Sequence, residues 1–485
     1  MKLKALLSNI TYEKLIGDDG SEITGIAYDS REVVPGGLFV CIKGFLSDGH
    51  AYIDKAIENG AAAIVVEDLP AAEVKAVVIQ VEDSREALAY LSAAWFGYPA
   101  SKMILIGLTG TKGKSTTAHM IKGILEEAGY KTGMIGTTGA YIGTEKFPTK
   151  NTTPESYELQ SLFAKMRDAD CKCVVMEVSS QGLKHKRTAG LTFDYGAFLN
   201  LSPDHISEGE HADFEEYLYC KSLLFNQTKQ AVVNIDDPNH KKVTAHAQSP
   251  ITVSVKGKAD FYGSKIQNIW EPGLLGVIFH MSGRLSGDFT LNMPGVFNVE
   301  NALIAASITH AIGVDQDTMA AALKKVYVKG RTQLVTDASH PAAFLIDYAH
   351  NALSMESLLK MLKDYGPKRL ICLFGGGGNK PKQRRYDMGE IAAKYADFTV
   401  LTMDNPRFED MDVINAHIIE GLKVHDGKYK IIPDRREAIR YLLDTCGEGD
   451  IVALIGKGHE EYQDVQGVKH FFSEEQVVAE YFRNK

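Results

Sequence analysis

The sequence predicts an α/β protein with three domains, each built around a mainly parallel sheet. Its 485 residues allow about three domains at roughly 150 residues each. Strand-like apolar runs alternate with helix-like amphipathic runs along the chain. A composition with 45% apolar and 24% charged residues is ordinary for globular proteins and excludes a largely disordered chain. We expect domains at residues 1–98, 99–330 and 331–485.

In the first domain, short apolar runs alternate with two helix-like segments. The expected strands are Ile23–Tyr28, Gly37–Ile42 and Ala61–Glu67. A first helix is expected at Ala51–Asn59, where Gly60 would end it, and a second at Ser84–Tyr98. The segment Pro99-Ala100-Ser101 is a plausible boundary because proline interrupts both helices and strands.

The second domain opens with the apolar strand Met103–Ile106, a glycine-rich turn and a helix at Ser115–Ala128. Further strands are expected at Cys173–Val178, Tyr195–Leu199 and Ala231–Asn234, and a last helix at Asn298–Ala311. The segment Lys329-Gly330-Arg331 marks the second boundary. In the third domain, strands are expected at Ala343–Ile346, Arg369–Phe374, Phe398–Leu401 and Ile451–Leu454, with helices between them. Sites in such domains lie at the carboxyl ends of the parallel strands.

Charge and composition exclude several classes of function. Lys and Arg number 53 against 62 Asp and Glu, and the net charge of −9 offers no basic field for nucleic acid. The sequence shows neither a secretory signal region nor an apolar run of about 18 residues, so we expect a cytoplasmic protein without membrane contact. The six cysteines are scattered and predict buried, reduced thiols and no zinc site.

The strongest functional signal is the glycine-rich turn between the strand and the helix that open the second domain. It contains Thr109, Gly110, Thr111, Lys112, Gly113, Lys114 and Ser115. In such a loop the backbone N–H groups approach phosphate oxygens, a lysine neutralises the β- and γ-phosphates, and a serine can bind Mg²⁺. The spacing is a variant, because Leu108 stands where the standard pattern has glycine. A tight structural turn would explain the glycines but not Lys114 and Ser115 together. The turn therefore predicts an ATP site.

This loop resembles the ATP loop of the Mur ligases, which use ATP to extend the peptide of peptidoglycan precursors, although the family usually has Asn where Lys112 stands. The resemblance spans essentially the whole chain. Further matching segments, in the family's order, are residues 151–156 (NTTPES), 177–180 (EVSS), 202–205 (SPDH), 221–225 (KSLLF), 295–301 (GVFNVEN), 330–331 (GR), 347–350 (DYAH), 404–407 (DNPR) and 456–460 (GKGHE). Near the start, Asp29-Ser30-Arg31 and Asp48-Gly49-His50 look like the uridine-nucleotide domain of the tripeptide-forming members.

The resemblance implies a central P-loop-type ATPase domain between a small uridine-nucleotide domain and a Rossmann-like amino-acid domain. ATP would convert a substrate carboxylate into an acyl phosphate, which an amine then attacks. The residues implied in catalysis are Lys114, Glu177, His205, Lys221 and Arg331. One Mg²⁺ would lie on Ser115 and Glu177, and a second on His205 and a carbamylated Lys221. Other ATP contacts implied are Asn298, Asn301, Arg331 and Asp347.

Each of these roles has a simpler alternative. Glu177 follows four apolar residues, where a charge is costly unless it is paired, and this favours the metal role. His205 could be a hydrogen-bonded structural histidine, and Lys221 without the family would be a solvated helix residue. Asn298 could cap a helix.

The substrates implied are UDP-N-acetylmuramoyl-dipeptide, ATP and a diamino acid, and the protein is expected to be a monomer. The residues implied in binding the UDP substrate are Ser30, Asn151, Thr152, Thr153, Ser179, His185 and Arg187. The family often has Gln where His185 stands. The residues implied in binding the amino acid are Arg385, Asp404, Asn405, Pro406, Arg407, Gly456 and Glu460.

The identity of the added amino acid stays open between two diamino acids. Arg407, in Asp404-Asn405-Pro406-Arg407, suits the distal carboxylate of meso-diaminopimelate, which L-lysine lacks. The ATP loop and the segment 378–385 look more like lysine-adding enzymes. Residues that touch the side chain should outweigh general similarity, so diaminopimelate is favoured.

Two other functions compete with this interpretation. Folylpolyglutamate synthases share the ATP loop, but they lack the uridine-binding first domain that residues 1–98 resemble. A noncatalytic nucleotide-binding relative would fit the departures Lys112, Gln181, His185 and Asn379. Both expected metal sites are retained, which speaks for catalysis.

Overall fold

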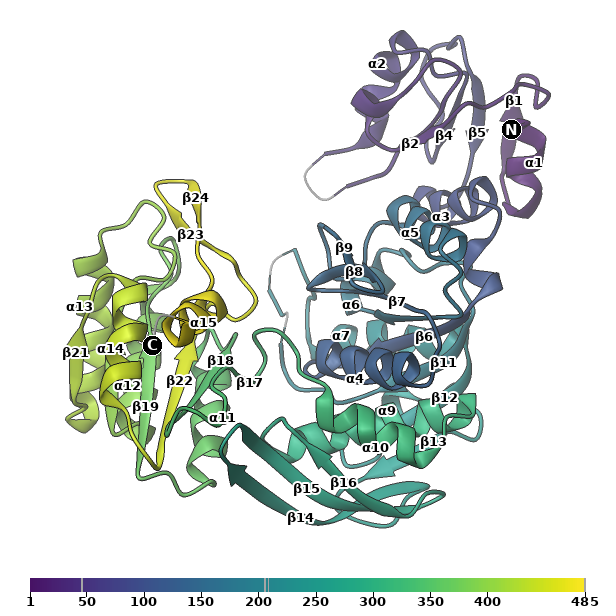
Figure 1. The fold of residues 1–485 in the computed structure, drawn as a ribbon. Coiled ribbons are helices and arrows are strands. Elements are labelled where there is room, and N and C mark those ends of the chain that lie inside the picture. Colours follow the sequence, from purple (N-terminus) through teal and green to yellow (C-terminus); the bar gives the residue numbers. More distant parts are fainter. Residues whose placement is uncertain (45–46, 205, 208, 484–485) are drawn as a thin grey trace. The chain divides into compact units, whose positions relative to one another are not determined.

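The structure is a computed structural model that describes residues 1–44, 47–204, 206–207 and 209–483. Two compact units make up the chain (Figure 1). The first contains Met1–Ser254 and Ile304–Val314, and the second contains Val255–Leu303 and Asp315–Lys485. Both units contain parallel sheets covered by helices, which confirms the predicted α/β class.

The N-terminal part of the first unit is a small sheet with the order β1-β5-β4-β3-β2. Its strands are β1 (Lys14–Ile16), β2 (Ile26–Ala27), β3 (Leu38–Val40), β4 (Ala63–Val66) and β5 (Val77–Gln80). Only β1 runs antiparallel to its neighbour. Its helices are α1 (Leu3–Leu6), α2 (Ile53–Glu58) and α3 (Ser84–Trp95). The expected helix at 51–59 begins later, because Asp48 accepts from the His50 N–H and starts a 3₁₀ turn at Gly49–Tyr52.

The larger sheet of the first unit has the order β13-β12-β11-β6-β10-β7-β8-β9. Its strands are β6 (Ile104–Thr109), β7 (Thr132–Gly136), β8 (Gly139–Ile142), β9 (Glu145–Phe147), β10 (Cys173–Glu177), β11 (Phe193–Phe198), β12 (Thr228–Asn234) and β13 (Ile251–Ser254). Its helices are α4 (Lys114–Glu127), α5 (Ser156–Asp168), α6 (Ser180–Lys184), α7 (Phe214–Ser222) and α8 (His240–Val243). Strand β6 pairs in parallel with β10 and β11, so their carboxyl ends meet at one edge.

The second unit begins with the antiparallel strands β14 (Phe261–Glu271), β15 (Leu274–Gly283) and β16 (Gly287–Leu291). Helix α9 (Val296–Ile312) follows and belongs in part to each unit, and α10 (Gln316–Lys325) comes next. The sequence did not predict the long hairpin of β14 and β15. Outward-facing polar residues along β14 hide its strand pattern.

The C-terminal sheet has the order β17-β18-β22-β19-β20-β21. Its strands are β17 (Gln333–Leu334), β18 (Ala343–Asp347), β19 (Arg369–Phe374), β20 (Phe398–Leu401), β21 (Tyr429–Ile431) and β22 (Asp450–Ile455). Its helices are α11 (Ala352–Lys363), α12 (Lys382–Tyr395), α13 (Met411–Leu422), α14 (Arg435–Thr445) and α15 (Glu474–Arg483). A hairpin of the half-buried β23 (Tyr462–Val465) and the exposed β24 (Val468–Phe471) lies outside this sheet.

Alternating side chains of the C-terminal strands build two cores. On β19, Leu370 and Cys372 join the core under α11, α12 and α13, whereas Ile371 and Leu373 join the core under α14 and α15. This alternation follows from the two-residue period of a strand. In a parallel sheet covered by helices on both faces, ligands bind beside the loops at the carboxyl ends of the strands, so we look for the site there.

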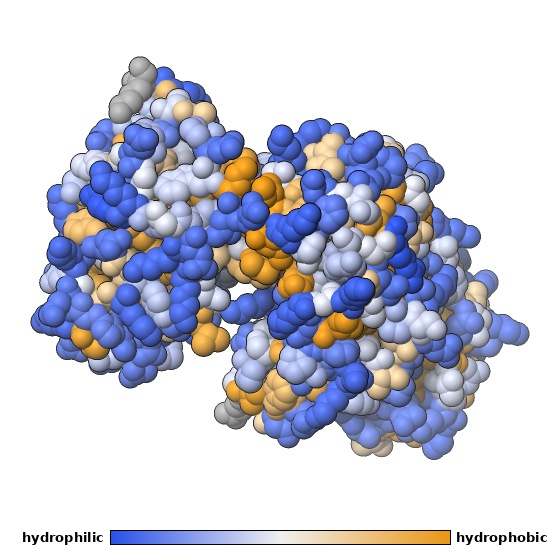
Figure 2. Space-filling model, turned by 90° about the horizontal axis from the view of Figure 1, so that it is seen from below, coloured by the Kyte–Doolittle hydropathy of each residue, from blue (hydrophilic) through white to orange (hydrophobic). Residues whose placement is uncertain are grey.

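Two further expectations concern cysteines and the surface. All six cysteines are free and buried, as predicted. In the part of the chain described here, no helix is both long and apolar enough to cross a membrane. Hydrophilic side chains cover most of the face shown in Figure 2, and hydrophobic residues lie between them in separate groups.

Candidate functional site

The glycine-rich loop joins the end of β6 to the start of α4. Gly113 has φ +89°, a conformation that favours glycine, and directly precedes the first helical residue, Lys114. The ammonium of Lys114 lies 2.7 Å from the Gly110 carbonyl oxygen and 3.1 Å from that of Thr111. The loop therefore presents a lysine and a helix N-terminus together, as an anion site requires.

Ser115 and Glu177 lie together, although they come from different elements. The Ser115 hydroxyl donates to Glu177 Oε1 at 2.8 Å, and Glu177 is 2% exposed at the end of β10. Thr137 also donates to Glu177, through its N–H at 3.0 Å and its hydroxyl at 3.2 Å. A Cβ on Gly136 would lie only 2.2 Å from Glu177 Oε1, so glycine leaves room for the carboxylate. This set of hard oxygen donors suits Mg²⁺.

Lys221 of α7 lies beside the same loop. Its ammonium is buried, donates to the Gly110 carbonyl at 2.9 Å and lies 4.6 Å from the centre of the Tyr217 ring. Burial, and then the charge of Lys114, hold the pKa of Lys221 well below its ordinary value. The implied role of His205 lies outside the described residues.

The segment 151–153 lies against the end of β10. The Thr153 hydroxyl donates to the Glu177 carbonyl at 3.0 Å and accepts from the Ser179 N–H at 2.9 Å. The hydroxyl of Thr152 lies 3.0 Å from that of Thr137. Thr137 thus connects the expected metal carboxylate with the expected substrate loop. Asn151 is exposed next to Thr152.

Glu155 binds two arginines near His185. Arg187 donates to Glu155 Oε1 from Nε at 2.7 Å and from Nη2 at 2.6 Å, and Arg85 of α3 lies 3.7 Å from Glu155 Oε2. Burial, followed by the charges of Arg85 and Arg187, lowers the pKa of His185 to about 4. This arrangement presents cations and a neutral imidazole, which suits an anionic substrate. Ser30 lies in the N-terminal sheet region, where its carbonyl oxygen accepts a hydrogen bond from the Asn59 side chain at 2.8 Å.

The remaining residues expected at the nucleotide lie in the second unit. Asn298 and Asn301 are buried and bond to each other at 3.2 Å, and Asn298 also donates to the Pro294 carbonyl at 2.8 Å. Because α9 begins at Val296, Asn298 is inside the helix, and the alternative that it caps the helix is wrong. Asp347 accepts from the N–H groups of Thr332 and Ala349, each at 2.8 Å, and burial raises its pKa.

Arg331 lies at the start of the C-terminal part of the chain. Its guanidinium carbon is 5.0 Å from the centre of the Tyr348 ring, a cation–π contact. The contact joins Arg331 to the residue that follows Asp347. These two predicted nucleotide residues are therefore brought close to one another.

A cavity of about 280 Å³ lies at the carboxyl ends of the C-terminal strands. Six of the residues expected to bind the amino acid line it: Arg385, Asp404, Asn405, Arg407, Gly456 and Glu460. Pro406 lies close to the glycine-rich segment after β19. A Cβ on Gly378 would lie only 1.8 Å from the carbonyl oxygen of Pro406.

The two arginines of this cavity differ in their surroundings. Arg385 is 2% exposed, and its Nη atoms bind both carboxylate oxygens of Glu409 at 2.8 and 2.9 Å. This pairing, first among the causes, lowers the pKa of Glu409 to about 2. Arg385 Nε is buried, and no described residue accepts from it.

Arg407 is held by its backbone instead. Its φ of +53° is left-handed, its N–H donates to the Asp464 carbonyl at 2.9 Å, and its carbonyl accepts from the Gln466 N–H at 2.8 Å. Its side chain is 36% exposed. Arg407 therefore presents the more available guanidinium to a carboxylate.

Comparison with known proteins agrees with this architecture. Models of the Mur ligase middle domain, the Mur ligase glutamate ligase domain and the Mur ligase family catalytic domain match residues 108–309, 330–458 and 22–96, respectively. A UDP-N-acetylmuramoyl-L-alanyl-D-glutamate–2,6-diaminopimelate ligase of Syntrophomonas wolfei is 40% identical, and the match covers 100% of both chains. The chain belongs to the Mur ligase family.

Solved structures extend the comparison of this Mur ligase. A structure of a UDP-N-acetylmuramoyl-L-alanyl-D-glutamate–2,6-diaminopimelate ligase has a TM-score of 0.74 and 27% identity, covering 100% of this chain and 99% of the other. A folylpolyglutamate synthase from Thermotoga maritima shares the fold with a TM-score of 0.60 and 18% identity, but covers only 76% of this chain.

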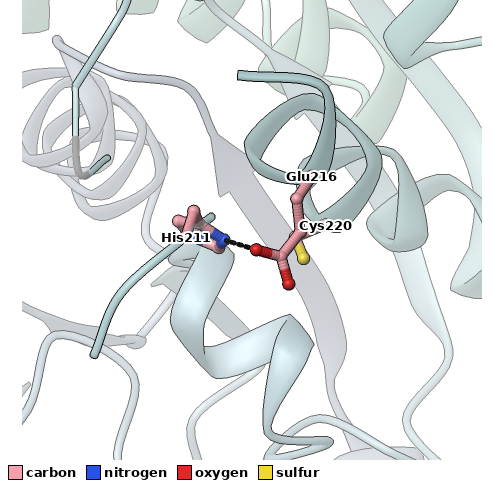
Figure 3. A group of neighbouring side chains, drawn as sticks. All are labelled: His211, Glu216 and Cys220. Carbon is pink, nitrogen blue, oxygen red and sulfur yellow. Dashed lines mark ion pairs between the residues drawn. The ribbon is translucent and has the colours of Figure 1, made fainter. Parts of the chain in front are cut away.

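A further side-chain cluster of this Mur ligase joins His211, Glu216 and Cys220, which point toward one another in Figure 3. His211 Nδ1 lies 3.9 Å from Glu216 Oε2. However, the Lys184 ammonium lies 2.8 Å from Glu216 Oε1, and burial raises the pKa of Cys220 to about 11. A metal needs a thiolate and an available carboxylate, so these contacts favour an ion-pair cluster.

Sequence reasoning missed three residues of these sites: Arg85, Thr137 and Glu409. Thr137 directly follows β7, which pairs with β10, and this position at the carboxyl end was an available signal. Glu409 carried no such signal, because a sequence does not show which charges pair with each other. Arg85 carried no comparable signal in the sequence.

Proposed function

We propose that this Mur ligase joins meso-2,6-diaminopimelate to UDP-N-acetylmuramoyl-L-alanyl-D-glutamate, with ATP converted to ADP and phosphate. The relative and the solved structure named above support the choice of these two substrates, because their names state UDP-N-acetylmuramoyl-L-alanyl-D-glutamate and 2,6-diaminopimelate. The observation that carries the choice of amino acid is the cavity in which Arg407 and Glu460 lie together. A carboxylate and an ammonium at the distal end of diaminopimelate match this pair of opposite charges.

We assign the chemistry of activation to the first unit. Lys114 and the N–H groups of the loop would neutralise the triphosphate, and Ser115 and Glu177 would hold Mg²⁺. Mg²⁺ would supply charge neutralisation during transfer of the γ-phosphoryl group to the glutamate carboxylate. We assign Lys221, as its carbamate, to a second metal position with His205, in the pattern of the family. The amine of the incoming amino acid then attacks the acyl phosphate and displaces phosphate.

Binding of the UDP substrate is assigned to the cationic region around Arg187, with Ser179, His185, Ser30 and the segment 151–153. Binding of adenine and phosphate in the second unit is assigned to Asn298, Asn301, Arg331 and Asp347. The three domains would divide these tasks at residues 1–98, 99–330 and 331–485. The six buried thiols fit a reducing compartment, so we propose that the enzyme acts in the cytoplasm. We also propose that it acts as a monomer.

The proposal is tested by ADP release from purified protein with the UDP-dipeptide and either diaminopimelate or L-lysine. We expect turnover with diaminopimelate at a kcat/KM at least tenfold above that with lysine, because lysine leaves Arg407 without a carboxylate. Turnover of lysine alone would overturn the choice of amino acid. Failure to release ADP with either amino acid would favour a noncatalytic relative.

A further inference from the structure

We propose that Lys457 is a positioning residue for the amino-acid cavity. It fixes Asn405 and, through Asn405, the Glu460 carboxylate, so that Glu460 can receive one ammonium group of the incoming amino acid. The inference rests on the proposed function. Lys457 lies in the segment 456–460, from which the function above uses only Gly456 and Glu460. Its side chain is 0% exposed, and such a buried charge requires partners.

The partners of Lys457 are polar residues that line the cavity. Its ammonium donates to Asn405 Oδ1 at 2.7 Å and lies 3.4 Å from Glu460 Oε2 and 3.4 Å from Asp404 Oδ1. The ring centre of Tyr462 lies 5.3 Å away. The ammonium therefore lies among the groups that the proposed function assigns to the amino acid.

Lys457 determines which way the Asn405 amide points. A lysine ammonium can only donate, so it must face the amide oxygen, which also accepts from the Asp464 N–H at 3.0 Å. The amide nitrogen is consequently directed to Glu460 Oε2, at 2.9 Å. Two donors thus hold Oε2, and among the described residues none donates to Oε1. Oε1 is the oxygen that Glu460 can offer to a ligand in the cavity.

Lys457 also sets the charge of this end of the cavity. Asp404 and Glu460 are two carboxylates, and one buried ammonium leaves a net charge of −1, which matches one ligand ammonium. Without Lys457 both carboxylates would lose the cation that lies 3.4 Å from each of them. Glu460 would also lose one of the two donors that hold its Oε2.

The test compares Lys457→Met, which keeps the length of the side chain without its charge, with Lys457→Arg, which keeps the charge. We expect Lys457→Met to raise the KM for diaminopimelate at least tenfold, about 1.4 kcal/mol, with the KM for ATP and for the UDP-dipeptide within twofold of wild type. Lys457→Arg should recover part of the loss. Lys360→Met, at an exposed lysine of α11, is the matched control and should leave all three KM values unchanged.

A double variant separates a positioning role of Lys457 from a contribution to the stability of the fold. It also keeps the inference testable if Lys457→Met alone does not fold. Lys457→Met in a Glu460→Gln background removes a cation and an anion together. If Lys457 acts through Glu460, this second substitution should add less than threefold to the KM of Glu460→Gln. A full tenfold addition, or an equal rise of all three KM values, would overturn the inference. A wild-type protein that releases no ADP with either amino acid would instead count against the proposed function, because that assay is carried out before the variants are compared.

Discussion

Lys114 and Lys221 donate hydrogen bonds to the same acceptor, the carbonyl oxygen of Gly110, at 2.7 and 2.9 Å. Two ammonium groups therefore converge on one point of the glycine-rich loop. Burial and this neighbouring charge hold the pKa of Lys221 well below its ordinary value, so the neutral amine is accessible at lower pH than in an exposed lysine. Only the neutral amine can react with CO₂ to form a carbamate.

We predict that Lys221 carries a carbamate when the protein is held in bicarbonate near neutral pH. The measurement is ¹³C NMR of the protein in ¹³C-labelled bicarbonate, which should show a carbamate carbon that disappears in Lys221→Gln. The exposed Lys229, paired with Asp194, is the control position, and Lys229→Gln should keep the signal. We also expect Lys221→Gln to lower kcat by about 100-fold or more, because the second metal would lose its anionic ligand and the charge of the transferred phosphoryl group would be less well compensated. A spectrum without the signal in wild-type protein would exclude the modification under these conditions.

A second prediction concerns Thr137, whose hydroxyl touches both Glu177 and Thr152. Partners that orient a metal ligand typically contribute 10–100-fold to metal affinity. Thr137→Val keeps the shape but removes the hydroxyl, and should raise the Mg²⁺ concentration for half-maximal ADP release about tenfold. Thr137→Ser retains the hydroxyl and should stay close to wild type. Equal Mg²⁺ requirements in the valine and serine variants would show that the hydroxyl has no such role.

Much of the fold could be predicted because its parallel strands are short, apolar and regularly spaced. The segments Arg369–Phe374 and Phe398–Leu401 are strands over the predicted ranges, since both their faces are buried and the apolar run is the whole strand. The hairpin Tyr462–Phe471 escaped prediction because β24 is exposed along its length and carries no such pattern. The hairpin matters through a tertiary contact, because Asp464 and Gln466 bind the backbone of Arg407.

The sites were predictable only where a motif states the chemistry. Lys114, Ser115 and Glu177 could be expected together because the carboxyl ends of adjacent parallel strands meet. The pairing of Arg385 with Glu409 could not, because a sequence shows which charges exist but not which of them neutralise each other. The same reason hid the role of Lys457, whose partners come from two segments, residues 404–405 and 460–462.

A third prediction tests the buried ion pair of Arg435 and Glu474, which joins α14 to α15. Arg435 donates to Glu474 Oε1 at 2.7 and 3.0 Å and to the Ile455 carbonyl at 2.9 Å, and both side chains are almost fully buried. Arg435→Met should lower the free energy of unfolding by about 3–5 kcal/mol, because it leaves a buried carboxylate without its cation. Urea unfolding followed by tryptophan fluorescence and circular dichroism measures this.

The double variant Arg435→Met with Glu474→Leu is the control for that loss. It removes both charges, and should recover at least half of the stability lost in Arg435→Met. If the double variant were as unstable as the single one, the loss would come from packing and not from the unpaired carboxylate.

The last prediction uses pH at His185, whose pKa is lowered to about 4 by burial and by Arg85 and Arg187. The unfolded chain, with an ordinary histidine pKa near 6.5, binds more protons than the folded protein between about pH 4 and 6.5. Stability contributed by neutral His185 is therefore present above pH 6.5 and is lost as the pH falls toward 4. His185→Gln cannot take up this proton, so its unfolding midpoint should rise relative to wild type as the pH is lowered from 7 to 4.5. NMR titration of the ring should give a midpoint that Arg85→Met moves upward, whereas Arg284→Met, at an exposed arginine of the second unit, should not move it. A ring that titrates near 6.5 in the wild-type protein would contradict the prediction, because the imidazole would then feel neither burial nor the two guanidinium groups.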